Sequence, residues 1–334
     1  MDGSANSHGG RHDGLALMLV SAFASRFASR FVSRWLPVPP SLCWSRANAS
    51  EIFTDRKRSF PMVKPRLQTA RVARLRSRLS PRDLAALTVL QRVRLASLRQ
   101  LQRLLVTDGS PAARTRRAQI MMTRLTELGL VTRFSRIIGG VRAGSSGYIY
   151  GLSGLGQAVL DTDGPLGGRR RRVWESKPYF QDHMLVVAEL YVQLVERHRV
   201  GQGELLAYDA EPAAWRHFTG KHNELVMVRP DAYVRVGRAA LEHSSFIEVD
   251  MATETLPTIQ KKCLRYVEYW RSGVEQQWRG VFPKVVWLVE TTRRREQIAG
   301  VVQKLASDAQ ALFDVGLLGD GPRLLGGAEQ GAAA

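Results

Sequence analysis

RPD at Arg229–Asp231 and FIEVD at Phe246–Asp250 decide the expected fold of this chain. In the first stretch an acid directly follows a proline, and in the second two acids end a short apolar run. Carboxylates at neighbouring strand ends supply the hard oxygen ligands that Mg²⁺ prefers in proteins. The two stretches therefore predict adjacent strands that hold a divalent cation, an arrangement typical of metal-dependent nucleases.

The pattern around these stretches predicts alternating helices and strands. The expected elements of the rear half, in chain order, are a helix at 182–197, extended segments at 204–208, 225–236 and 245–249, a helix at 256–271, a strand at 285–289 and a last helix near 294–307. Val285–Val289 is continuously apolar, which is typical of a strand buried on both faces. The predicted order around the acids is therefore helix, three strands, helix, strand.

Residues 80–152, which precede these elements, show a different pattern. Ser80, Pro81 and Asp83 together form a helix-start signature, with a capping serine and a proline at the first helical position. Helices are expected at about 81–92, 98–105 and 112–128, followed by strands at 130–134 and 148–152 around a glycine-rich tip. Three helices and a β-hairpin are the order of a winged helix, in which the third helix enters the major groove of DNA.

The charge of the chain is concentrated in its front half. The formal net charge is +19, and residues 1–160 hold 26 Lys and Arg against 7 Asp and Glu, whereas residues 161–334 hold 23 of each. A strongly basic region indicates a polyanionic partner, and double-stranded DNA is the expected one. An arginine-rich proteome would raise the basic count everywhere, and the balanced rear half argues against that alternative.

Arginine side chains on the third helix and the hairpin tip are the expected DNA contacts, because arginine both neutralises phosphate and reads guanine. They are Arg114, Arg116, Arg117, Arg124 and Arg142. The alternative is a winged helix that docks another protein with the same basic face.

The remaining segments are expected to be irregular. Residues 1–75 are predicted to be a disordered or irregular leader, 161–176 a basic linker and 313–334 a flexible tail. Aromatic and basic stripes within residues 14–36 leave a membrane-surface helix or a transit-like peptide as alternatives. Cys43 and Cys263 lack metal-binding spacing, and no apolar run reaches about 18 residues. These features favour a reduced cytoplasm and no membrane span.

The order of elements, with Asp231 on the second strand and Glu248 on the third, resembles the core of the PD-(D/E)XK nucleases. Over about residues 80–310 the chain is similar to the replication-relaxation family of plasmid and conjugative-element proteins. It also resembles the MobC-type relaxases, which join a winged helix to this core. The motifs that carry the resemblance are His183 with Glu189-Leu190, Arg229–Ala232, Glu248–Asp250 with Thr253-Glu254, and Lys262 with Tyr266.

The resemblance implies an α+β chain, with an N-terminal winged-helix domain at 78–160 and a restriction-endonuclease-like domain at 177–312. Asp231, Glu248 and Asp250 would hold Mg²⁺ or Mn²⁺, with Asp250 as third ligand or water-orienting base. Glu189 would match the extra acid that some of these nucleases carry on their first helix. His183 is expected to start or pack that helix.

One position departs from the nuclease pattern. Asp250 stands where the Glu-x-Lys motif has its lysine, which polarises the attacking water and stabilises the charged phosphorane. Lys261 and Lys262 are the candidates to replace it from the following helix. Lys262 and Tyr266 share one helix face, so both could reach the same site, or Lys262 could lie along the surface while Tyr266 packs.

The implied function is a cytoplasmic DNA-binding protein of a plasmid or conjugative element that nicks or relaxes DNA at an origin-like site. Other replication or mobilisation proteins are expected partners, and a homodimer is left open. The alternative is a non-catalytic replication or transcription factor with an inert nuclease-like scaffold. A third is a toxin-like or restriction-type nuclease of broad specificity. The spacing does not require Tyr266 or Tyr269 as a nucleophile.

Overall fold

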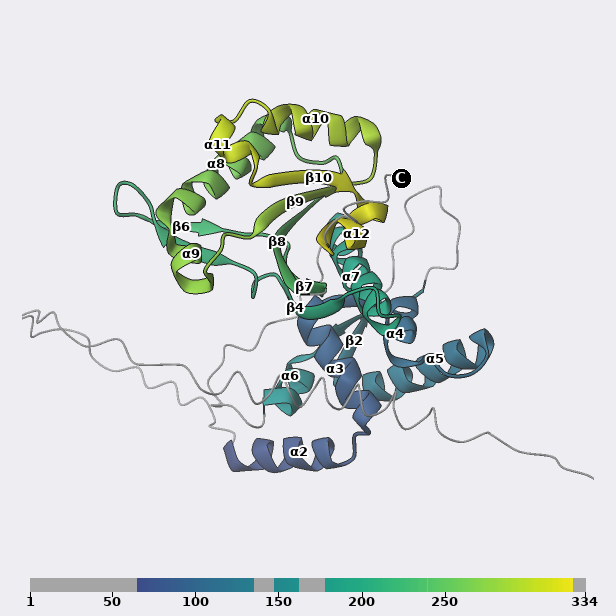
Figure 1. Cartoon of the computed structure of the whole chain (residues 1–334). Helices are drawn as coiled ribbons and strands as arrows, with labels where there is room; N and C mark the ends of the chain where they lie inside the picture. The colour runs from purple at the N-terminus through teal and green to yellow at the C-terminus, as the bar shows by residue number, and fades with distance from the viewer. Residues whose placement is uncertain (1–64, 135–146, 162–177, 239, 327–334) are drawn as a thin grey trace, which may run out of the picture. The chain divides into compact units, whose positions relative to one another are not determined.

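The computed structural model describes residues 65–134, 147–161, 178–238 and 240–326. From Met62 onward the chain forms one compact unit, whereas the other unit, Met1–Pro61, lies outside the described residues. We refer to residues 65–161 as the front segment and to residues 178–326 as the rear segment (Figure 1). Within these segments no helix combines the length and the apolar character needed to cross a lipid bilayer.

The front segment contains the three expected helices and the two expected hairpin strands. Its elements in chain order are α2 (Pro65–Ser77), α3 (Pro81–Val93), β1 (Leu95–Ser97), α4 (Leu98–Leu105), α5 (Pro111–Glu127), β2 (Val131–Phe134), β3 (Ile149–Leu152) and α6 (Gly154–Leu160). The strands form an antiparallel sheet in the order β1-β3-β2. Helix α2 corrects the expectation of irregular chain up to residue 75, because Val72 is buried against the rest of the segment.

Side-chain caps fix where α3 and α4 begin. The Ser80 hydroxyl accepts a hydrogen bond from the backbone N–H of Asp83, whose carboxylate accepts from the Ser80 N–H at 2.8 Å. Ser97 and Gln100 make the same reciprocal pair at the start of α4. Each pair satisfies two backbone donors that a helix start would otherwise leave free.

The rear segment contains the expected helix, three strands, helix and strand, with further elements between them and after them. Its elements are α7 (Pro178–Arg199), β4 (Glu204–Ala210), β5 (Arg216–Thr219), β6 (Leu225–Val228), β7 (Ala232–Arg238), β8 (Leu241–Asp250), α8 (Leu256–Ser272), α9 (Val274–Arg279), β9 (Lys284–Val289), α10 (Thr292–Val302), α11 (Ser307–Gln310), β10 (Phe313–Leu317), a 3₁₀ turn η2 (Leu318–Asp320) and α12 (Gly321–Leu325).

Two expectations for this segment are corrected. The extended stretch 225–236 is two strands in different sheets, because β6 pairs with β5 while β7 joins the main sheet beyond Pro230. Residues 313–326 are ordered rather than a flexible tail, since β10 pairs in parallel with β9 and Leu325 is buried.

The main sheet has the strand order β10-β9-β8-β7-β4 and places helices on both faces. Strands β4, β7 and β8 are antiparallel neighbours, whereas β8, β9 and β10 run parallel. Helices α8 and α10 cover one face, and α7 and α12 cover the other (Figure 1). Successive residues of a strand point to opposite faces, so Ile247 and Val249 face α7 while Phe246 and Glu248 face α8.

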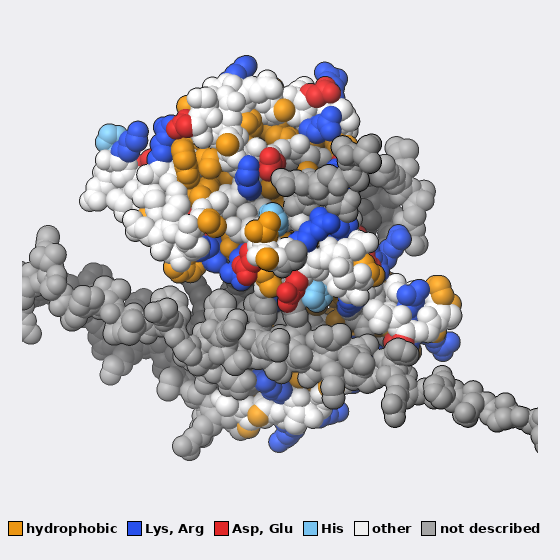
Figure 2. Space-filling view, in the orientation of Figure 1, with side chains coloured by type: hydrophobic (Ala, Val, Ile, Leu, Met, Phe, Trp, Pro, Cys, Tyr) orange, Lys and Arg blue, Asp and Glu red, His pale blue; other side chains and the backbone are white. Residues whose placement is uncertain are grey.

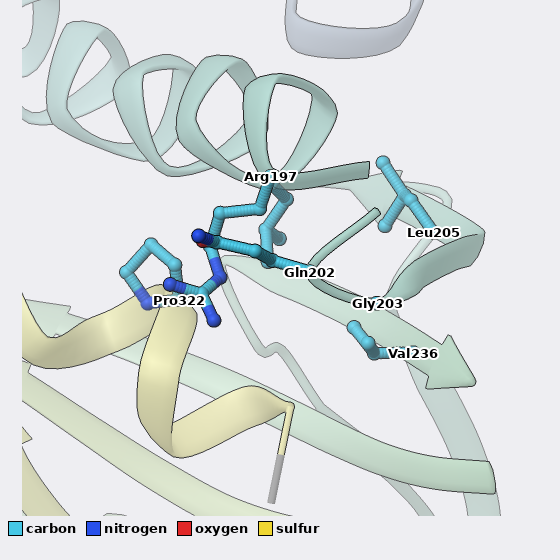
Figure 3. Close-up of a pocket in the computed structure, with 7 residues that line it drawn as sticks. Arg197, Gln202, Gly203, Leu205, Val236 and Pro322 are labelled. Carbon is cyan, nitrogen blue, oxygen red and sulfur yellow. The ribbon is translucent and has the colours of Figure 1, made fainter. Parts of the chain in front are cut away.

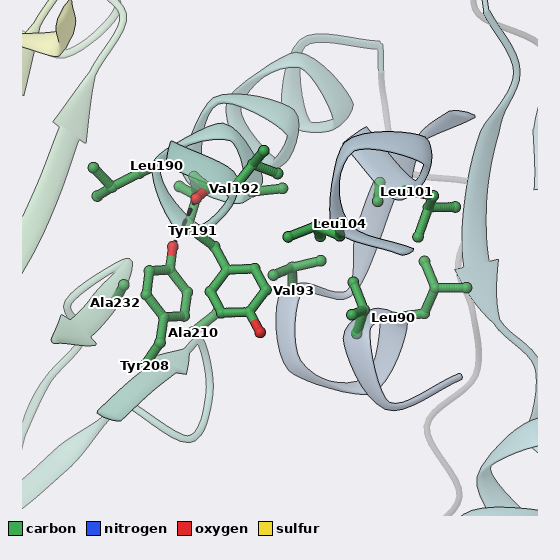
Figure 4. Close-up of a cluster of buried hydrophobic side chains, with 14 of the residues drawn as sticks. Leu90, Val93, Leu101, Leu104, Leu190, Tyr191, Val192, Tyr208, Ala210 and Ala232 are labelled. Carbon is green, nitrogen blue, oxygen red and sulfur yellow. Dashed lines mark hydrogen bonds between the residues drawn. The ribbon is translucent and has the colours of Figure 1, made fainter. Parts of the chain in front are cut away.

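The front and rear segments share one hydrophobic core. Leu90 and Leu101 from the front helices belong to the same buried cluster as Tyr191 and Tyr208 of the rear segment (Figure 4). The two tyrosine rings lie 4.9 Å apart between centroids, and the Tyr208 hydroxyl donates to the Val187 carbonyl at 2.6 Å. The two segments are therefore packed together and not merely joined by the chain between them.

This shared core predicts that a cavity in the front segment destabilises the rear one. Leu101→Ala removes a fully buried side chain, and we expect a loss of about 3 kcal/mol in the free energy of unfolding. Residues 78–160 contain no tryptophan, so tryptophan fluorescence does not report on their local environment. In urea, fluorescence and circular dichroism should both shift to the same lower midpoint. Leu241→Ala, at a side chain 65% exposed, is the control. A fluorescence midpoint that stays at the wild-type value would contradict the shared core.

Candidate functional site

Asp231 immediately precedes β7 and is fixed beside the end of β8. Its backbone N–H donates to the Ile247 carbonyl at 2.9 Å, and its Oδ2 accepts from the Val249 N–H at 2.7 Å. His183 of α7 reaches the same place, with Nε2 at 3.3 Å from Asp231 Oδ2 and 3.1 Å from the Val249 carbonyl. His183 therefore contacts the candidate site and does more than start or pack its helix.

Glu248 is almost completely buried and has a partner for each carboxylate oxygen. The Tyr266 hydroxyl donates to Oε1 at 2.6 Å, and Lys262 Nζ donates to Oε2 at 3.1 Å. Lys262 also donates to Glu254 Oε1 at 2.7 Å. Of the two lysines considered from sequence, Lys262 therefore reaches Glu248, whereas Lys261 is exposed.

Burial dominates the electrostatics of this cluster. It raises the pKa of Glu248 to about 7, and the negative charge of Asp231 acts in the same direction, while Lys262 and Tyr266 oppose the shift. Burial disfavours the charged form of Lys262, but the carboxylates of Glu248 and Glu254 outweigh it and raise the lysine pKa. Burial likewise opposes charge on His183, and the hydrogen bond to Asp231 outweighs it and raises the histidine pKa.

Asp250 does not join this cluster as a free ligand. Its Oδ2 accepts from Arg294 Nε at 2.5 Å, and Arg294 also donates to the Glu254 carbonyl at 2.5 Å. Among the described residues no group of three His, Cys, Asp or Glu side chains is arranged to hold a metal ion. This corrects the expected cage of three acids, because the arginine from α10 neutralises Asp250.

Glu189 is also placed differently from the expectation. Its carboxylate accepts from Gln100 Nε2 at 3.1 Å and pairs with Arg103, which also binds Glu196. It lies six residues beyond His183 on α7, which turns it by about 240° around the helix axis. Glu189 therefore binds the front segment instead of supplementing the site.

Asp231 and Glu248 are the two expected ligands that no arginine neutralises among the described residues, so they are the ones that would hold a divalent cation. Mg²⁺ keeps several waters and is commonly held by only one or two carboxylates together with substrate phosphate. The absence of a third acid among the described side chains is compatible with such a site. Asp250 is not part of it.

The described arginines of α5 divide into two pairs. Arg124 binds the buried Asp83 carboxylate, and Arg117 binds Asp108, so both hold α5 in position rather than standing free for DNA. Although burial opposes it, the hydrogen bond from Arg124 helps to lower the pKa of Asp83. Arg116 is exposed and Arg114 half-buried, whereas Arg142 lies outside the described residues.

The exposed face of α5 is formed by side chains that were not predicted from the sequence to be functional. They are Thr115, Gln119, Ile120 and Thr123, which lie beside Arg116 at helical spacing. Ile120 is apolar but 60% exposed. The spacing of the buried Ala118, Met122 and Leu125 carries the signal that excludes Ile120 from the buried face.

A small pocket lies away from these groups, between the end of α7 and α12. It is lined by Arg197, Gln202 and Pro322 among others, and its volume is about 10 Å³ (Figure 3). That is room for about one water molecule. None of the carboxylates described above lines it.

Comparison with known proteins identifies the family. Residues 87–285 match the family described as replication-relaxation, which is more than half of the 334-residue chain. The chain therefore belongs to the replication-relaxation family, which relates it to the replication of plasmids and other mobile elements. No curated protein and no solved structure matches it.

The raised pKa of Glu248 predicts a pH-dependent stability. The native state holds a proton on this carboxyl that the unfolded state releases, so this contribution is lost as the pH rises from about 4.5 to about 7. We expect the free energy of unfolding of the wild type, minus that of Glu248→Gln, to fall by about 2 kcal/mol between pH 5 and pH 8. Urea unfolding at both pH values measures it. Glu242→Gln, at a side chain 61% exposed, should show no such change. A difference that grows with pH would contradict the assignment.

Proposed function

We propose that this protein binds double-stranded DNA at an origin-like site of a plasmid or conjugative element, with α5 as the helix that enters the major groove. The front segment then acts as a winged helix, with β2 and β3 as the base of the wing. The observation that supports the proposal is the exposed face of α5, in which Arg116 and Gln119 lie beside Ile120. The basic front half supplies the attraction for DNA phosphate.

The side chains on this face suit base readout. Arginine pairs with guanine, glutamine with adenine, and an apolar side chain contacts the methyl group of thymine. Arg116, Gln119 and Ile120 provide one of each on a single helix face. The ion pairs of Arg117 with Asp108 and of Arg124 with Asp83 keep that face turned outward.

The proposal predicts that Arg116→Ala weakens binding of a 30-base-pair duplex of mixed sequence. We expect about a tenfold loss of affinity in fluorescence anisotropy, and a decrease of about 0.9 in the slope of log affinity against log salt. Arg293→Ala on α10 makes the same charge change on an exposed side chain and should leave both values unchanged. Equal losses in both variants would mean that only overall charge matters, and no loss in either would exclude α5 as the contact.

Metal-assisted nicking by a PD-(D/E)XK-like rear segment is a second candidate function. The observation that favours it is that Lys262 brings its ammonium group to Glu248 beside Asp231, which supplies the lysine that the Glu-x-Lys position lacks. A bound Mg²⁺ or Mn²⁺, held by Asp231 and Glu248, would stabilise the charge that develops on the phosphate. Lys262 would donate a hydrogen bond to the attacking water or to the phosphate oxygen.

The other residues of the cluster would keep these groups in place. Tyr266 donates to Oε1 of Glu248, and Glu254 accepts from the ammonium group of Lys262. Arg294 ties Asp250 to the backbone of Glu254, which fixes the chain between β8 and α8. The role of Asp250 is then to position Glu254, not to bind metal.

Nicking is tested on supercoiled plasmid that carries its own transfer or replication origin, with Mg²⁺ or Mn²⁺ added. We expect Asp231→Asn and Lys262→Met each to slow nicking by about 100-fold, because each removes a group that acts on the reacting phosphate. Asp308→Asn, at a side chain 53% exposed, should nick like the wild type.

No nicking by the wild type, or equal nicking by Asp231→Asn, would exclude catalysis at this site. DNA binding through α5 with an inert rear scaffold would then account for the protein. Cleavage of plasmids that lack this origin would instead indicate a nuclease of broad specificity.

A further inference from the structure

The β5–β6 hairpin presents one face that the core does not cover. Its register pairs His217 with Met227 and Thr219 with Leu225, while the alternate residues Phe218 and Val228 are buried in the rear core. We define the outer face of the hairpin as the side chains of Trp215, His217, Thr219, Leu225, Met227 and Arg229. Leu225 is 76% exposed, and basic and histidine side chains gather at the hairpin tip on the left of Figure 2.

Arg229 is stacked on Trp215 within this face. Its guanidinium carbon lies 5.1 Å from the centre of the indole ring, and its Nε donates to Met227 Sδ at 2.9 Å. Stacking on an aromatic ring holds an arginine in place while leaving its terminal N–H groups to donate.

Arg229 has no carboxylate partner among the described residues, in contrast to the buried or half-buried Arg216, Arg279 and Arg294. Arg216 and Arg279 both pair with Glu275, and Arg294 pairs with Asp250. An exposed, oriented guanidinium in an otherwise charge-balanced segment is suited to bind an anion from outside.

The chain ties this pair to the candidate site. Arg229 precedes Asp231 by two residues, and the intervening Pro230 is buried. The Glu211 N–H donates to the Asp231 carbonyl at 3.0 Å, and the Trp215 N–H donates to the Pro212 carbonyl at 3.1 Å. Both sides of the stacked pair are therefore anchored to the backbone that carries Asp231.

We propose that the outer face of the hairpin binds single-stranded DNA beside Asp231, with Arg229 contacting a phosphate and an unpaired base stacking on the Arg229–Trp215 pair. The proposal rests on the proposed DNA-binding function and names the form of DNA that the rear segment takes. Aromatic and guanidinium surfaces bind the faces of unpaired bases, which are hidden within a duplex. His217 and Leu225 extend this surface along the hairpin.

The test is fluorescence anisotropy of the full chain with a labelled 20-nucleotide oligothymidine. We expect Arg229→Gln to weaken binding about tenfold and to lower the salt slope by about 0.7, the value for one phosphate of a single strand. Trp215→Phe keeps an aromatic ring and should retain most of the affinity, whereas Trp215→Leu should lose as much as Arg229→Gln. Arg293→Gln is the control for the lost charge, and thermal midpoints confirm that the variants fold.

A second measurement, with the 30-base-pair duplex, separates this inference from the proposed function. Arg229→Gln should bind the 30-base-pair duplex like the wild type, and Arg116→Ala should bind oligothymidine like the wild type. If α5 does not bind the duplex, the oligothymidine measurement still tests the hairpin face independently. Unchanged oligothymidine binding in Arg229→Gln, or an equal loss in Arg293→Gln, would overturn the proposal.

Discussion

The buried carboxylate of Glu248 is the constraint on which the rear segment depends. A charged or protonated carboxyl inside a sheet is costly unless its oxygens have partners. Here Tyr266 and Lys262 supply them from one face of α8. The position of α8 over the sheet is therefore set by polar contacts as well as by the packing of Ile259 and Val267. Lys262 also lies 5.6 Å from the centre of the Trp287 ring on β9, which closes the cluster from the neighbouring strand.

The same constraint accounts for how the other acids are arranged. Asp231 lies beside β8 because its carboxylate accepts from the Val249 backbone, and its charge contributes to the raised pKa of Glu248. A third free carboxylate in the same place would raise the electrostatic cost further. Asp250 avoids that cost by pairing with Arg294, and Glu254 avoids it by pairing with Lys262. Asp250 and Glu254 therefore help to hold α10 and α8 in position. Asp231 and Glu248 are the two carboxylates that remain near Lys262.

Local signals of the sequence predicted much of this fold. The signature of Ser80, Pro81 and Asp83 predicted the start of α3, and the helix expected at 98–105 coincides with α4. The helix and strand order around Glu248 followed from periodicity. Contacts between distant residues were not predictable in the same way. Nothing local indicates that Arg294 reaches Asp250 or that Glu189 binds Arg103, because both pairings depend on tertiary packing. β5 was not predicted, because it has only four residues, Arg216–Thr219, and they form no apolar run.

Crystallography in the presence of Mn²⁺ tests the central account of the site most directly. An anomalous difference map locates this ion without reference to activity. We expect a peak within about 2.6 Å of carboxylate oxygens of both Asp231 and Glu248, with Asp250 still paired to Arg294. A peak bound by Asp250, or no peak near Asp231 at saturating Mn²⁺, would contradict it.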